Sequence, residues 1–113
     1  MNTQFSYQSE KLSAARKSLM LPHPQGEARG VANAFQECMH AFHDLRQELL
    51  DDDARRWVRT IQDFMDTAGI DDAAGRGTFL VKAEQLTADD LFELSRAVDE
   101  LAYWFDRHFW EVN

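Results

Sequence analysis

Hydrophobic residues recur at alternating spacings of four and three residues through the first half of the chain. They are Val31, Phe35, Cys38, Phe42, Leu45 and Leu49. Such spacings bring the side chains onto one stripe of an α-helix. The pattern therefore predicts a helix over about 27–50, and it stops at the three aspartates of 51–53. Because acidic residues suit the first turn of a helix, we expect another helix over 51–68, ending before Gly69.

A second long stripe occupies the C-terminal part of the chain. Its seam positions are Leu91, Leu94, Val98, Leu101 and Phe105. Thr87 precedes this stripe and is a good N-cap, since its hydroxyl can accept a hydrogen bond from a first-turn amide. Asp89 and Asp90 add negative charge at the positive end of the helix dipole. The sequence therefore predicts a helix over 87–111.

The end of this helix is apolar on too many sides for one core-facing stripe. Five aromatic residues stand within eight positions: Tyr103, Trp104, Phe105, Phe109 and Trp110. At about 100° per residue they surround most of the helix. They must be covered by the rest of this chain or by a second copy, and the pattern does not choose between core and interface. The candidate interface consists of Tyr103, Trp104, His108, Phe109 and Trp110.

The remaining segments complete a helical domain. A tail and a helix are expected over 1–21, followed by a turn at 22–26 that contains two prolines. The segment 78–86 fits either a short helix or a strand, and we favour the helix because a lone strand has no partner here. The fold class predicted is all-α, a small bundle of four to five mainly antiparallel helices. Residues 1–113 are expected to form one domain.

The net charge of −8 lies entirely in the C-terminal half. Residues 1–50 balance five basic with five acidic residues, whereas residues 51–113 carry seven basic and fifteen acidic ones. An acidic surface disfavours direct binding to nucleic acid or anionic membranes. Solubility is the simplest explanation of the charge, and a basic protein partner or mimicry of nucleic acid are the sharper alternatives. The N-terminus resembles no signal peptide, no apolar run would span a bilayer, and Cys38 is the only cysteine. A cytoplasmic protein is therefore expected.

One half-motif for a metal occurs in the predicted second helix. Glu37 and His40 have the Glu-x-x-His spacing of di-iron bundles, and Asp44 lies one turn further on. His43 or His108 would be the nearest additional ligands. Only one copy of the motif is present, and the heptad points His40 away from the core. No other cofactor motif is recognisable, so a divalent metal is the only cofactor considered.

Other reactive residues have no catalytic context. The Gly75-Arg76-Gly77 turn would offer amides to an anion but lacks a Walker pattern, and Cys38 belongs to the apolar seam. The leading hypothesis is thus a non-enzymatic helical interaction protein that forms a homodimer through its aromatic C-terminal helix. The alternatives are a metal-binding bundle or metal-dependent enzyme using Glu37, His40 and Asp44, and an acidic mimic of nucleic acid.

Overall fold

The structure is a computed structural model that describes residues 5–20, 23 and 26–110, apart from the side chains of residues 109 and 110. Its helices are α1 (Ser6–Leu19), α2 (Glu27–His43), the 3-10 turn η1 (Gln47–Leu49), α3 (Asp52–Met65), α4 (Thr78–Gln85) and α5 (Ala88–Trp110). The described residues contain no β-strand. The predicted all-α class is confirmed, and the ambiguous segment after residue 77 is helical.

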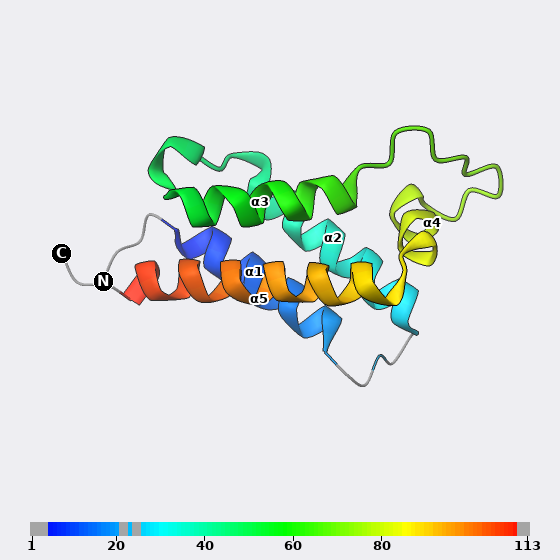
Figure 1. Cartoon of the computed structure of the whole chain (residues 1–113). Coiled ribbons are helices and arrows are strands. Elements are labelled where there is room, and N and C mark those ends of the chain that lie inside the picture. Colours follow the sequence, from blue (N-terminus) through cyan, green and yellow to red (C-terminus); the bar gives the residue numbers. More distant parts are fainter. Residues whose placement is uncertain (1–4, 21–22, 24–25, 111–113) are drawn as a thin grey trace.

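The helices pack as two layers of antiparallel neighbours (Figure 1). α1 packs on both α2 and α5, α3 packs on α5, and the short α4 packs on α2. α3 and α5 run in opposite directions along the molecule, and the long connection between α3 and α4 projects from one end. None of the helices in the described ranges has the length and apolar character that a membrane span requires.

Two helix starts follow the local chemistry read from the sequence. Thr87 Oγ1 accepts a hydrogen bond from the Asp90 amide at 3.1 Å, and Asp90 Oδ2 accepts one from the Thr87 amide at 2.9 Å. This reciprocal pair is a capping box. Asp51 Oδ1 accepts a hydrogen bond from the Ala54 amide at 2.8 Å and caps α3. These caps satisfy amides that the helices themselves leave unpaired.

α2 is shorter than expected. The stripe predicted a helix to about residue 50, but α2 ends at His43 and is followed by η1. Leu49, the last seam position, is exposed, whereas its neighbour Leu50 is buried in the core. After η1 the chain places Leu50 in the core and Asp51 at the N-cap of α3. α3 likewise ends at Met65 rather than near residue 68.

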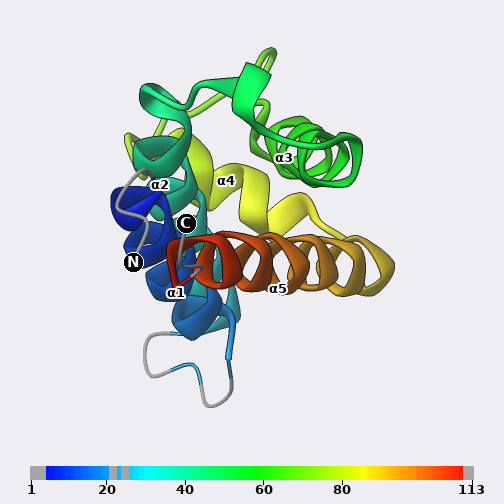
Figure 2. The ribbon, with the colours of Figure 1, turned by 90° about the vertical axis from the view of Figure 1, so that its left-hand side faces the viewer.

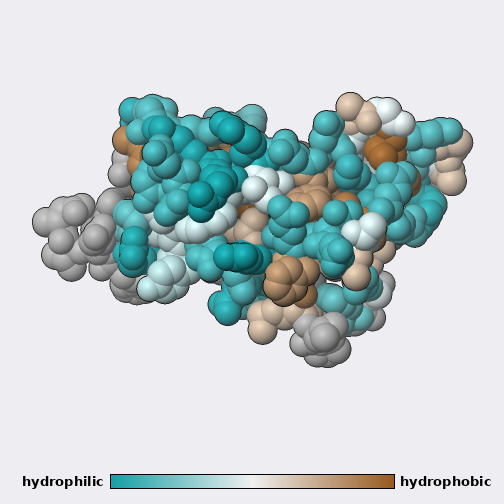
Figure 3. Space-filling view, viewed as in Figure 1, coloured by the Kyte–Doolittle hydropathy of each residue, from teal (hydrophilic) through white to brown (hydrophobic). Residues whose placement is uncertain are grey.

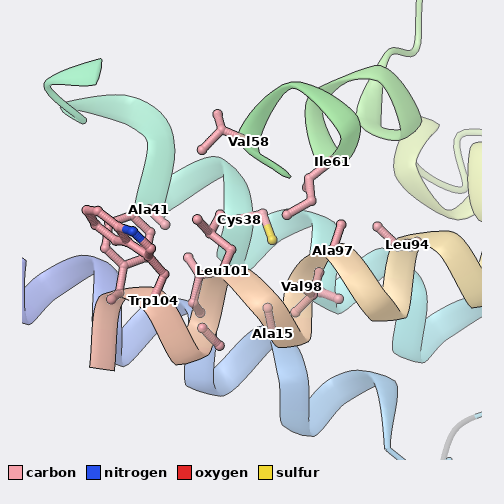
Figure 4. Close-up of a cluster of buried hydrophobic side chains, with 14 of the residues drawn as sticks. Ala15, Cys38, Ala41, Val58, Ile61, Leu94, Ala97, Val98, Leu101 and Trp104 are labelled. Atoms are coloured by element: carbon pink, nitrogen blue, oxygen red, sulfur yellow. The ribbon is translucent and has the colours of Figure 1, made fainter. Parts of the chain in front are cut away.

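The core lies where α1, α2, α3 and α5 meet (Figure 4). The largest fully buried side chains are Phe35, Phe105, Leu12, Ile61, Leu94 and Leu101. In Figure 4, Leu94, Ala97, Val98 and Leu101 of α5 lie among Ala15 of α1, Cys38 of α2 and Ile61 of α3. The seam positions of α5 therefore form its buried face, as the spacing predicted.

Candidate functional site

Trp104 belongs to the core of this chain. It is only 5% exposed. Its ring lies edge-on to Phe5 at 5.4 Å and to Phe105 at 5.3 Å between centroids, and its Nε1 donates a hydrogen bond to Asp51 Oδ2 at 3.0 Å. Residues before α1 and α3 thus cover the indole. Of the two explanations left open for the aromatic helix end, internal packing applies to Trp104.

Asp51 connects this aromatic cluster to α3. One carboxylate oxygen caps the helix, and the other accepts the Trp104 N–H. The pKa of the Asp51 carboxyl is lowered, first by the hydrogen bond from the Ala54 amide and then by the one from Trp104. Since both bonds favour the ionised form, they help to hold α3 against α5 at neutral pH.

His108 packs on Trp104 rather than standing free. The two rings stack at 3.8 Å between centroids with an interplanar angle of 22°. His108 Nδ1 lies 2.7 Å from the carbonyl oxygen of Trp104, which can only accept, so Nδ1 carries the proton in this bond. The imidazole is half-buried. Its position gives it a packing role at the end of α5.

Tyr103 has the opposite environment from its neighbour. Its side chain is 65% exposed, and the Arg107 guanidinium lies 5.9 Å from the ring centroid. Trp104 and Phe105 are both buried, and Tyr103 lies about 100° and 200° around the helix from them, so it points away from the core. The other two members of the candidate interface, Phe109 and Trp110, lie on α5, but their side chains are outside the described residues.

The outer face of α5 carries a second exposed aromatic residue that the sequence reasoning missed. Phe92 is 73% exposed, the highest value among the large apolar side chains described. Phe92 and Tyr103 are eleven residues apart, which puts them about 17 Å apart along the helix and within about 20° of the same direction. The sequence did contain a sign of this exposure: Phe92 follows the seam position Leu91 and is not itself on the seam.

Three hollows border this outer face on the side of α1, and two of them include an exposed aromatic residue. One, of about 510 Å³, is lined by Ser13, Arg16, Asp99, Glu100, Ala102, Tyr103 and Asp106. The other is lined by Leu19, His23, Glu27, Val31, Leu91, Phe92 and Ser95. An apolar patch is visible beside the end of α1 in Figure 3, with hydrophilic surface along part of its edge. Such a rim of polar groups around exposed apolar side chains is typical of a protein-binding surface.

The predicted metal ligands are not assembled into a site. Glu37 Oε2 lies 3.5 Å from Lys11 Nζ. His40 and Asp44 are exposed, and the only contact of Asp44 with a neighbouring histidine is a 3.9 Å approach to His43 Nε2. Within the described ranges, no three His, Cys, Asp or Glu side chains are grouped to hold a metal ion.

The other candidate groups are occupied or buried. Asp72 accepts hydrogen bonds from the amides of Arg76 and Gly77, each at 2.8 Å, so these amides are already used. The Arg76 guanidinium pairs with both carboxylate oxygens of Glu84, at 2.9 and 2.6 Å. Burial, assisted by the charge of Glu37, raises the pKa of the Cys38 thiol to about 12. Cys38 is therefore protonated at neutral pH and a poor nucleophile.

The outer face of α5 is thus the surface in the described structure with the clearest features of a binding site. Its aromatic residues are exposed, whereas the Arg76 guanidinium and the Gly77 amide are paired and the Cys38 thiol is buried. The comparisons with known proteins give no further assignment: no protein-family model, curated protein or solved structure matches this chain.

Proposed function

We propose that this protein is a non-enzymatic helical interaction module that forms a homodimer through the outer face of α5. The single observation that carries the proposal is the pairing of Phe92 and Tyr103 on one exposed face. Aromatic side chains are enriched at binding hot spots because they bury a large area at a small cost in conformational entropy. The proposed interface differs from the one expected from the sequence: it includes Phe92 and leaves out the buried Trp104.

The expected dimer is weak. Burying Phe92 and Tyr103 of both copies would remove on the order of 500 Å² of aromatic surface from water. At about 25 cal/mol per Å², the hydrophobic free energy gained is roughly 12 kcal/mol. Association itself costs an estimated 4–15 kcal/mol, to which the ordering of side chains is added. The small difference predicts a dissociation constant in the micromolar range or weaker.

Two further features support a cytoplasmic protein that binds proteins rather than nucleic acids. Cys38 is a buried free thiol, which suits a reducing compartment. The exposed residues of α5 include Asp89, Glu93, Asp99 and Glu100, a surface that would repel phosphates. The same acidic surface would accept a basic protein partner beside the dimer contact.

Light scattering on a sizing column, across a wide range of concentrations, tests the homodimer. We expect a mass that rises towards twice the 13.1 kDa of one chain. The Phe92→Ser/Tyr103→Ser variant should stay monomeric at every concentration. Met39→Ser is the matched control, because Met39 is also exposed but lies on α2. A wild-type chain that remains monomeric at millimolar concentration, or a double variant that dimerises like wild type, would contradict the proposal.

A further inference from the structure

We infer that two copies meet with their α5 helices antiparallel, about a two-fold axis that passes between residues 97 and 98. This inference rests on the proposed self-association and specifies its geometry. The exposed side of α5 carries a stripe at spacings of three and four residues: Asp89, Phe92, Arg96, Asp99, Tyr103 and Asp106. Helices that pair side by side contact each other through stripes of this period.

The stripe is complementary to itself only in the antiparallel direction. A two-fold interface requires that residue i of one copy meets residue j of the other and that j meets i. With the axis between 97 and 98, Phe92 faces Tyr103 of the other copy and Arg96 faces Asp99. Each contact occurs twice. The two aromatic contacts then flank a centre of two opposite-charge pairs.

A parallel pairing of the same face is disfavoured by charge. Arg96 would then meet Arg96 and Asp99 would meet Asp99, and like charges placed together repel. In the antiparallel pairing, Asp89 faces Asp106 at each end, a like-charge contact, while the two Arg96–Asp99 pairs at the centre attract; in the parallel pairing all of these contacts join like charges. The charges along this face therefore select the direction of the second helix.

Asp99 is able to accept the additional partner. Its Oδ1 already accepts a hydrogen bond from Arg16 Nε at 2.7 Å, which fixes the carboxylate at the edge of α1. The Asp99 side chain is nevertheless 60% exposed. A carboxylate has several acceptor positions, so it can bind Arg16 and a second guanidinium together. Arg16 thus positions Asp99 for the contact.

The outer stripe of α5 is open to solvent next to the end of α1. In Figure 2 the N-terminal half of α5 extends away from α1. Phe92 and Ser95 line a hollow together with Leu19 of α1 and Val31 of α2, and the Phe92 ring itself is 73% exposed. A helix of a second copy would cover the apolar surface that the chain itself leaves exposed.

Cysteine cross-linking tests the direction of pairing. One chain carries Asp89→Cys and another carries Arg107→Cys; both substitutions lie on exposed positions. A short bis-maleimide should join the two kinds of chain in a mixture and should join neither kind to itself, because copies of one position are about 26 Å or more apart in the antiparallel pair. Wild type is the control, since its Cys38 is buried.

Charge reversal supplies a second test. Arg96→Asp should weaken the dimer about tenfold at low salt, with a smaller effect at high salt, because both central pairs become repulsive. Arg59→Asp on α3 makes the same change in net charge at another exposed position and should have little effect.

The outcomes separate this geometry from the proposed function. Cross-linking of Asp89→Cys chains to one another would show a parallel pair and overturn the inference. A dimer by light scattering without cross-links in the mixture would also overturn it while leaving self-association intact. A monomer at all concentrations would refute both. A monomer that binds a basic helical peptide through Phe92 would assign this face to a different partner and overturn the inference as well.

Discussion

The neighbouring residues Tyr103 and Trp104 provide the most direct test of the structure. Replacing each by alanine removes an aromatic ring from adjacent positions of one helix, one ring being exposed and the other buried. Truncating a buried Trp lowers the free energy of unfolding by about 3–5 kcal/mol, because the hydrophobic transfer free energy of the ring is lost and a cavity is left in the core. Removing an exposed side chain changes stability by about 0.5 kcal/mol or less.

The structure also predicts which interactions account for the stability lost in Trp104→Ala. Trp104→Phe keeps an aromatic ring against Phe5 and Phe105 but removes the N–H that Asp51 accepts. We therefore expect a loss of about 1–2 kcal/mol for this variant, intermediate between the two alanine substitutions. Because a domain of this size is stable by roughly 5–15 kcal/mol, Trp104→Ala would remove a large share of the total.

Urea unfolding followed by far-UV circular dichroism measures these differences without using tryptophan as the probe. The midpoint should fall in the order wild type, Trp104→Phe and Trp104→Ala, with Tyr103→Ala close to wild type. Measurements at a concentration where the chain is monomeric separate stability from association. A loss for Tyr103→Ala as large as that for Trp104→Ala would refute the assignment of one ring to the core and the other to the surface.

Three further predictions concern single residues. Asp51→Ala should cost about 2 kcal/mol in urea unfolding at pH 7, from the helix cap and the Trp104 hydrogen bond together. Because the folded-state pKa of Asp51 is lowered, the part of this contribution that depends on its charge is present above about pH 4 and is lost as pH falls through the folded pKa, so the difference in stability between wild type and variant should narrow in acid. Gly30→Ala should lower the thermal midpoint, although alanine usually stabilises a helix, because a Cβ would lie 2.7 Å from the Ser18 carbonyl oxygen; a raised midpoint would contradict this close approach. Cys38 should react with a thiol reagent at pH 8 only after urea unfolds the chain, and rapid labelling of the folded protein would contradict its burial.

Much of the secondary structure was predictable because its causes lie within a few residues. The buried positions of α5 follow from the spacing of Leu94, Val98 and Leu101. Asp51 and Thr87 were identified as helix starts from their side chains, and both make the expected hydrogen bonds. The early end of α2 was not predictable in this way, because Leu45 and Leu49 continue the apolar period beyond the helix.

The candidate site was predictable only in part. An excess of aromatic residues near the end of α5 was evident, and Tyr103 was included in the candidate interface. Phe92 was missed because its exposure depends on which other helices cover α5. The spacing of Glu37, His40 and Asp44 likewise said nothing about whether further ligands would lie opposite them.

The sequence by itself therefore determined the helical class and the starts of α3 and α5, since hydrophobic period and helix capping act between residues close together in the chain. Only the tertiary structure decided which aromatic residues are buried and which are exposed. Trp104 is core because Phe5, nearly a hundred residues earlier, packs against its ring, while Tyr103 has no such cover. Burial depends on what lies opposite a side chain in space, and for these residues that partner comes from a distant part of the chain.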